Sequence, residues 1–462
     1  MDDHRIDMLF PSSEQSEEPE DRVPTVAERV SRVLERSTTL KSKAAYVPQV
    51  VSLGPFHFGK PQLAKYETFK HKLPGILADR PGRPPFEKLV EDMADQSIKI
   101  RQWYRTFHVC PDSDEELAWI LARDGLFLLR FLRKIFTRDW DCDQATRFFF
   151  LQNQLPSAVE EDIMKLENQT TMFAAVQEDI MKLENQIPMF ALQMILQWQA
   201  GTDLDLNSIL RHVWHTLSPF LYKRDRLDSN VITGTSLRPD SHLLGFVYEN
   251  ITRSSDPTDH TEHNRMWKKK RYITLPSAVE LRRKGVKFAA HVENLNEVRF
   301  DGKTCTFHLP TIEMDDRTDA VMRNLVAFEA FVCKKETKPL MCYVDVMDRL
   351  INTAADVEVL RNGGILHNRL GTDEEVAGVW NGMRKVMGKG EYEPIDSAID
   401  DVITFYTNYE YIMICGELKE KYFPRAWLVV STLAGCIVLL LSVLQTILAW
   451  EQVRLQRQSM NI

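Results

Sequence analysis

The sequence predicts a mainly helical α+β protein with a small β-hairpin or sheet and a single C-terminal transmembrane helix. Most of the chain places apolar residues at helical spacing, and one Asp-Gly pair lies between two short strand-like segments. The last apolar run contains no charged residue. We therefore expect a disordered acidic N-terminus (1–22), a soluble, mainly helical body (23–425), a transmembrane helix (426–450) and a short tail (451–462).

Composition narrows the classes of function. The chain has 462 residues, 27% of them charged, and a net charge of −8, which argues against a nucleic-acid partner. Its seven cysteines form no CxxC pair, so they indicate free thiols in a reducing compartment and not a zinc or disulfide framework. The first residues are acidic and lack an apolar core, so we expect no signal peptide.

The first part of the body is predicted to be helical. A capping box at Thr25 and Glu28 should begin a helix. Residues 46–61 are dense in Pro and Gly and predict an ordered loop. Two amphipathic helices should follow, one ending near Pro74 and one covering residues 84–107.

The next helix, over residues 116–136, is apolar enough to lie at the centre of the core. We expect Asp124 and Gly125 to interrupt it. A lone buried Asp is more often a hydrogen-bonded structural acid than a catalyst, so we give Asp124 a structural role first.

An internal duplication follows, because EDIMKLENQ occurs at residues 161–169 and again at 178–186. We predict a continuous helix through both copies, with Pro188 ending or kinking it near Ile187. Its apolar seam has heptad spacing and comprises Leu166, Phe173, Ile180, Ile187 and Met194. In the downstream copy, Leu183, Ile187 and Phe190 should be buried, and Glu184, Asn185 and Gln186 should bind the backbone groups that Pro188 frees.

The later part of the body should combine strands and helices. Asp301-Gly302 between alternating segments predicts a type I′ hairpin. Helices are expected near 322–333 and 343–361, the second re-capped at Thr353 and stopped at the paired glycines 363 and 364. A further capping box should begin a helix at Thr372.

The chain contains no nucleophile elbow, P-loop, dinucleotide fingerprint, HExxH or EF-hand pattern. We therefore predict no catalytic, cofactor-binding or metal-binding residues from motifs. Two HxxH pairs, beginning at His212 and His260, are interpreted as ordinary packing and a polar loop. Glycosylation sequons occur at Asn168 and Asn250, and they matter only if the body faces a secretory lumen.

The run from Ala426 to Trp450 is the predicted membrane anchor, and the lipid bilayer is its predicted partner. About 25 residues give roughly 37 Å of helix, against roughly 30 Å of hydrocarbon. Trp427 lies near one end and Trp450 at the other, as interfacial aromatics do, while Leu439 lies near the midplane. The small pair Ser431 and Gly435 predicts a weak homodimer through the anchor, and a buried core helix is the alternative to a membrane span.

Several blocks of the sequence resemble one plant family in order. They are YVPQVVSLGPFHFGK, DGLFLLRFL, LENQIPMF, LPSAVELRRKGVKF, LPTIEMDDRTDAVMRNLVAFE, YVDVMDRLINTAADVEVLRNGGIL, LGTDEEVAGVWN and KYFPRAWLVVSTLAG. Together they resemble the family called domain of unknown function 247, also named UPF0481, from about Tyr46 to Trp450. The residues that match its motifs are Pro55, Asp124, Leu183, Glu184, Asn185, Gln186, Pro188 and Phe190.

The resemblance has one departure. Family members carry a single LENQ block, so residues 161–177 are interpreted as a duplicated insertion and only the downstream copy should keep the family role. The resemblance implies a C-terminally membrane-anchored plant protein with a helical body and no accepted enzyme activity. Links of some relatives to pollen–pistil self-recognition imply a recognition or signalling role.

Two functions therefore remain open. The first is a non-enzymatic interaction or recognition protein that binds an unidentified protein partner at the plasma membrane or an endomembrane, with its body in the cytosol by default. The second is a membrane-tethered enzyme without a linear motif, for which Asp124, His57 and Glu184 are the residues to inspect. Charge bias barely orients the anchor, because three basic residues precede it and two follow it, namely Lys419, Lys421 and Arg425 against Arg454 and Arg457.

Overall fold

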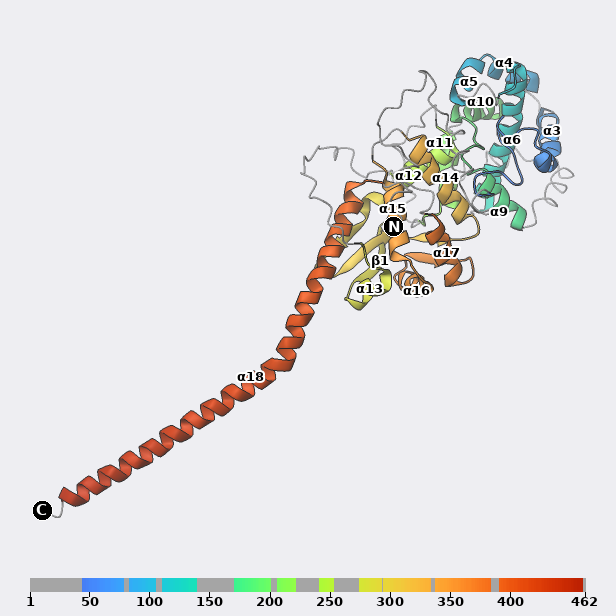
Figure 1. Ribbon diagram of the computed structural model, residues 1–462. Helices are drawn as coiled ribbons and strands as arrows, with labels where there is room; N and C mark the ends of the chain where they lie inside the picture. Colours follow the sequence, from blue (N-terminus) through green and yellow to red (C-terminus); the bar gives the residue numbers. More distant parts are fainter. Residues whose placement is uncertain are drawn as a thin grey trace, which may run out of the picture. The chain divides into compact units, whose positions relative to one another are not determined.

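The computed structural model describes residues 44–78, 83–104, 110–138, 170–200, 206–221, 241–252, 274–292, 294–333, 337–383 and 390–459. It contains two compact units, Met1–Asp401 and Val402–Ile462. Among the described residues, helices predominate and the strands form two small sheets, which confirms the predicted fold class (Figure 1). The predicted N-terminal tail and the first capping box lie outside the described residues.

The first part of the larger unit is built around one long buried helix. Helix α6 contacts α3, α4, α10 and α11 (Figure 1). Its apolar residues, including Leu117, Leu121 and Phe127, are almost completely buried. The elements of this part are η2 (Pro61–Leu63), α3 (Ala64–Ala78), α4 (Phe86–Ala94), α5 (Ser97–Tyr104), α6 (Asp114–Arg138), α9 (Thr170–Asp179), α10 (Met189–Ala200), α11 (Leu206–Leu217) and α12 (Leu243–Ile251).

Helix α6 is not interrupted at Asp124 and Gly125, so that prediction was wrong. Gly125 has a packing role instead, because a Cβ built there would lie 2.2 Å from Ile195 Cδ1 and 3.3 Å from Leu192 Cδ2. The missing side chain lets α10 approach α6 closely. The glycine therefore costs some helix propensity but permits a close helix–helix contact.

Two other helix boundaries also differ from the prediction. Helix α3 continues through Pro74 to Ala78, since a proline one turn before the end removes only one helical hydrogen bond. The single helix expected over residues 84–107 is two helices, α4 and α5, separated by Asp95 and Gln96.

The downstream EDIMKLENQ copy is not helical beyond its second residue. Helix α9 ends at Asp179 and α10 begins at Met189, so the predicted heptad seam does not continue from Phe173 to Met194. Pro188 does not end a helix, because its carbonyl accepts the amides of Ala191 and Leu192 at the start of α10. We call residues 180–188 the LENQ turn. The upstream copy lies outside the described residues.

Strands appear after residue 286. β1 (Lys287–Val292) pairs in parallel with β3 (Thr306–Pro310), which pairs antiparallel with β2 (Arg299–Asp301). The predicted hairpin is confirmed, but Asp301 pairs with Thr306, so the loop has four residues and is not a type I′ turn. Cys305 in this loop has a φ of 55°.

The rest of the unit surrounds these strands. The predicted capping boxes at Thr353 and Thr372 are confirmed. The predicted helix stop is also confirmed, because α16 ends just before the paired glycines and Gly364 has a φ of +75°. The elements are α13 (Ala278–Arg283), η5 (Leu295–Glu297), β4 (Ile312–Met314), α14 (Thr318–Phe331), α15 (Pro339–Leu350), α16 (Ala354–Asn362), β5 (Leu366–Asn368), which pairs in parallel with β4, and α17 (Asp373–Met383).

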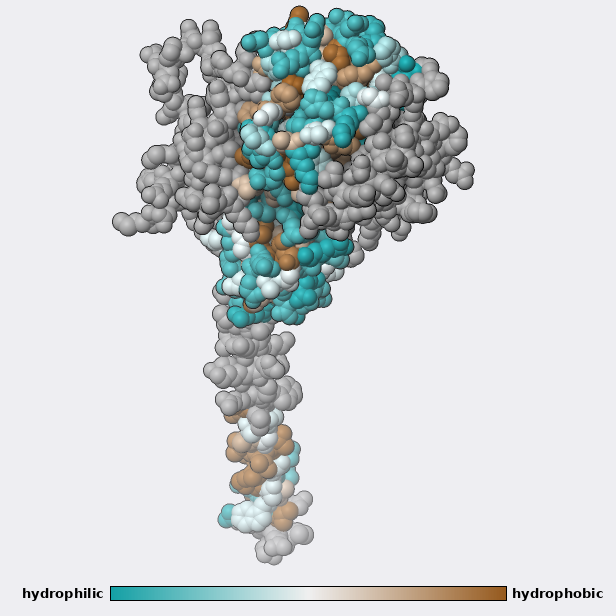
Figure 2. All heavy atoms as spheres, turned by 90° about the vertical axis from the view of Figure 1, so that its right-hand side faces the viewer, coloured by the Kyte–Doolittle hydropathy of each residue, from teal (hydrophilic) through white to brown (hydrophobic). Residues whose placement is uncertain are grey.

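The chain ends in one continuous helix, α18 (Glu393–Ser459). Its segment Val429–Leu455 has a mean hydropathy of 2.2 and no buried residue, and it is long and apolar enough to cross a bilayer. Figure 2 shows hydrophobic residues gathered on this part of the helix. Leu439 and Trp450 are 67% and 66% exposed. The segment overlaps the predicted anchor but is shifted by a few residues toward the C-terminus.

Candidate functional site

The three titratable candidates meet at one segment, residues 44–60, which we call the N-terminal loop and which contains His57. Gly54 in this loop donates its amide to Asp124 of α6 at 2.9 Å. His57, three residues later, lies beside Glu184 of the LENQ turn, with Nε2 and Oε2 3.6 Å apart. Segments separated by more than 100 residues in sequence therefore meet here.

Asp124 belongs to a buried charge cluster, defined by Glu67, Lys70, Arg123 and Asp124. Asp124 Oδ1 accepts from Lys70 Nζ at 2.6 Å and from Arg123 Nη2 at 3.3 Å. Glu67 contacts the same two cations at 2.5 Å each. Lys70 also donates to the Ser52 carbonyl at 2.8 Å, which ties the cluster to the N-terminal loop.

The cluster contains two cations and two carboxylates, and the side chains of Lys70, Arg123 and Asp124 are fully buried. Burial raises the pKa of Asp124, while Lys70 and Arg123 oppose that shift. Burial also acts to raise the pKa of Glu67, but Lys70 and Arg123 outweigh it, so that pKa is lowered. Because both oxygens of Asp124 are occupied by neighbours, the carboxylate has a structural role.

A second carboxylate, Asp179 at the end of α9, binds the start of the N-terminal loop. Its Oδ2 accepts the amides of Gln49, Val50 and Val51 at 3.0, 2.7 and 2.9 Å. Lys182 lies 2.9 Å from Oδ1 and also donates to the Val47 carbonyl at 2.9 Å. Consecutive amides directed at one anion form a backbone nest.

The two amides of the LENQ turn complete this attachment. Asn185 accepts the Leu53 amide at 2.6 Å and donates to the carbonyls of Val51 and Asp179 at 3.0 and 2.9 Å. Gln186 donates to the Ile180 and Lys182 carbonyls, both at 2.8 Å. The expectation that these two side chains bind backbone groups is therefore confirmed, although the groups belong to a turn and not to a broken helix.

The remaining LENQ residues divide between core and surface. Leu183 and Ile187 are 8% and 1% exposed, as predicted. Phe190 is only half-buried, so that prediction was wrong, and the Lys99 ammonium lies 4.1 Å from its ring centroid. Glu184 faces His57, and it binds no backbone group in the part of the chain that the structure describes.

Gly54 lies where these segments converge and has a φ of +71°. A Cβ there would lie 2.5 Å from the Tyr104 hydroxyl and 3.3 Å from the Gln186 carbonyl oxygen. A side chain would therefore face both a strained backbone and a steric clash. Pro55 follows directly, and its carbonyl accepts the Phe58 amide at 3.4 Å.

His57 and Glu184 form a buried titratable pair, with side chains 1% and 6% exposed. Burial lowers the pKa of His57 to about 3, with Lys60 and Lys182 adding to the effect. Burial raises the pKa of Glu184 to about 7, and Lys60 opposes that shift. Lys60 Nζ lies 2.6 Å from His57 Nδ1. The fold thus favours a neutral imidazole beside a carboxyl group that titrates near neutrality.

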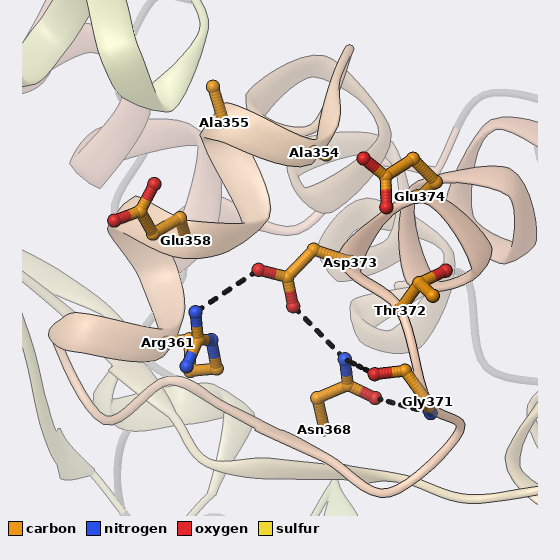
Figure 3. Close-up of a pocket in the computed structure, with 9 residues that line it drawn as sticks. All are labelled: Ala354, Ala355, Glu358, Arg361, Asn368, Gly371, Thr372, Asp373 and Glu374. Carbon is orange, nitrogen blue, oxygen red and sulfur yellow. Dashed lines mark hydrogen bonds and ion pairs between the residues drawn. The ribbon is translucent and has the colours of Figure 1, made fainter.

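A polar surface pocket lies elsewhere, between α16 and α17 (Figure 3). Arg361 pairs with Asp373 at 3.2 Å, and Asn368 donates to Asp373 Oδ1 at 3.0 Å. None of the three candidate residues lines it. The lining residues are Ala354, Ala355, Glu358, Arg361, Asn368, Gly371, Thr372, Asp373 and Glu374.

No group of three or more His, Cys, Asp or Glu residues suited to a metal ion occurs among the described residues. The pair beginning at His260 lies outside them. The pair beginning at His212 lies on α11.

A family model described as a plant protein of unknown function, DUF247, matches residues 30–441. The chain belongs to the DUF247 family. It is similar to a putative UPF0481 protein of Arabidopsis thaliana, with 27% identity covering 87% of this chain and 86% of the relative. A second Arabidopsis UPF0481 protein is 25% identical, covering 91% of this chain and 86% of that protein. No solved structure is significantly similar to the chain.

Within this DUF247 chain, sequence reasoning identified Asp124, Asn185 and Gln186 but missed the residues that they work with. Lys70 and Glu67 were assigned only to an amphipathic helix. Asp179 lies in the duplicated EDIMKLENQ block, which offered a signal, but nothing local shows that its partners lie about 130 residues earlier.

Proposed function

We propose that this DUF247 protein is a membrane-anchored, non-enzymatic interaction protein whose body presents a recognition surface to an unidentified protein partner. The observation that carries the proposal is the segment Val429–Leu455, which is apolar and entirely exposed. Its large side chains, such as Leu440 at 70% exposure, have no protein environment in the described chain. A hydrocarbon environment would remove this apolar surface from water.

The body supports the non-enzymatic part of the proposal. Asp124, the strongest catalytic candidate by burial, has both carboxylate oxygens bound by Lys70, Arg123 and the Gly54 amide. Such a carboxylate is fully buried with both oxygens engaged, which favours a structural role over contact with a substrate. Among the described body residues, Ile98 is the one large hydrophobic side chain that is strongly exposed, at 73%, so a recognition surface on this part would be mainly polar.

A membrane-tethered enzyme remains the second candidate, favoured by one observation. His57 and Glu184 are buried and close together, and their pKa values are shifted in opposite directions. Acid–base pairs in active sites show such shifts. The pair is also explained by its structural position between the N-terminal loop and the LENQ turn, so we rank this function second.

The membrane anchor is tested by expressing the full chain and washing membranes with alkaline carbonate. We expect the native chain to stay in the pellet. Leu439→Arg should reduce the membrane fraction, because an arginine near the centre of a span costs about 2.5–3.5 kcal/mol on insertion scales. The exposed body substitution Asp92→Arg is the matched control. Native protein that is released by carbonate would contradict the anchor.

A further inference from the structure

We propose that the Asn250 sequon is a structural hydrogen-bonding site that excludes a glycan, and that the body of the chain therefore folds on the cytosolic side of the membrane. This inference rests on the membrane anchoring proposed above and adds the side of the bilayer. Asn250 and Thr252 form an Asn-Ile-Thr triplet at the C-terminal end of α12.

Both polar side chains of the triplet bind their own helix. Asn250 Nδ2 donates to the Phe246 carbonyl at 2.8 Å, and Thr252 Oγ1 donates to the Tyr248 carbonyl at 3.0 Å. Asn250 is 9% exposed and Thr252 is 8% exposed. The sequon is therefore turned into the fold and is not displayed on a surface loop.

The surroundings of α12 leave little space for a sugar. All residues of this helix except Glu249 are buried, and the helix contacts α11 and α14. Tyr248 donates to Glu329 at 2.8 Å, and its ring lies 5.2 Å from that of Phe328.

Glycosylation replaces one hydrogen of the Asn side-chain nitrogen with a bond to a bulky, strongly hydrated sugar, which is tolerated at surfaces. Burying that sugar beside α14 would cost its hydration, and exposing it would require α12 to leave the core. A glycan at Asn250 and the observed fold are therefore mutually exclusive. In a secretory lumen, sequons are glycosylated on the emerging, unfolded chain. A body synthesised into the lumen would therefore be exposed to glycosylation at Asn250 before it could fold.

The thiols support the same compartment independently. Cys110, Cys305 and Cys333 of the body are free thiols. Cys305 and Cys333 are partly exposed, in the hairpin loop and after α14. Partly exposed free thiols are typical of a reducing compartment, since oxidising ones convert them to disulfides.

The hairpin loop also supplies a test. Gly302→Asn creates an Asn-Lys-Thr acceptor from Lys303 and Thr304, all three positions being exposed. A Cβ at residue 302 meets nothing within 4 Å, so the variant should fold. The reciprocal variant carries a short sequon appended after Ile462. Both are made as full chains in eukaryotic cells, and a gel shift on endoglycosidase treatment is the readout.

We expect the appended acceptor to be glycosylated and the Gly302→Asn acceptor to remain unmodified. Glycosylation at residue 302, or a native glycan that Asn250→Gln removes, would overturn the proposal. If neither acceptor is modified, protease added to sealed membranes decides, because digestion of the body supports a cytosolic side and protection overturns it. Loss of the chain from carbonate-washed membranes would instead show that the anchoring itself is wrong.

Discussion

The N-terminal loop and the segment Val429–Leu455 use their side chains in opposite ways. In the loop, Val51 and Leu53 are 0% and 1% exposed, and their amides are bound by Asp179 and Asn185. In the C-terminal segment, apolar side chains such as Leu440 are exposed although the backbone is fully helical. The loop has its partners within the protein, whereas the apolar helix needs an environment other than water.

Substitutions in the protein can test this comparison, and we expect the largest loss of stability at the buried charge cluster. Asp124→Ala should lower the free energy of unfolding by about 3–5 kcal/mol, because Lys70 and Arg123 would remain buried without a balancing charge. Thermal unfolding of the detergent-solubilised chain measures the effect. The control Asp92→Ala removes a surface pair with Lys88, at 50% exposure, and should change stability by less than about 1 kcal/mol. Equal shifts would contradict the structural role of Asp124.

The next largest effect concerns the side-chain amide of Asn185, which binds the N-terminal loop. Asn185→Ala should destabilise the body by about 1–3 kcal/mol, since the Leu53 amide and the Val51 carbonyl would lose their buried partner. Asn168→Ala, in the upstream copy, should stay within about 0.5 kcal/mol. A larger melting-temperature shift for Asn168→Ala would show that the upstream copy is the structural one.

The His57–Glu184 pair predicts a pH dependence that appears only when one partner is removed. The pKa of Glu184 in the folded protein is raised to about 7. Glu184 therefore contributes fully to stability below about pH 4.5, and this contribution is lost as the pH rises through 7. The folded pKa of His57 is lowered to about 3, so its contribution is full above about 6.5 and is lost as the pH falls toward 3. The two slopes oppose each other in the native chain.

Glu184→Gln should therefore lose about 2 kcal/mol of stability between pH 7 and pH 5, and His57→Gln should lose about 2 kcal/mol between pH 5 and pH 7. Chemical denaturation at several pH values measures both slopes. The native chain should vary least over this range. Slopes of the same sign in the two variants would refute the opposed titrations.

The smallest expected effect concerns the C-terminal apolar segment and its predicted self-association. Ser431 and Gly435 are exposed, and a Cβ at Gly435 meets nothing within 4 Å, so two anchors are predicted to approach there. Gly435→Ile should weaken self-association in a transmembrane reporter assay by about 1 kcal/mol, with Leu439→Ile as the control. A signal that Gly435→Ile leaves unchanged would remove the predicted homodimer.

Features with a local cause were predictable from the sequence. The capping boxes at Thr353 and Thr372, the hairpin and the apolar C-terminal helix depend on neighbouring residues. The errors at Gly125 and in the LENQ turn have a tertiary cause. Helix periodicity could not reveal that α10 packs on Gly125, nor that Asp179 binds amides about 130 residues away and so ends α9.

The hydrogen bond from Asn324 to the Ala45 carbonyl spans 279 residues of sequence. At synthesis rates of about 5–20 residues per second, the N-terminal loop waits roughly 14–56 s after its translation before this partner exists. Attachment of the loop can therefore begin with Asp124, Asp179 and Asn185, and the contact with Asn324 closes it last.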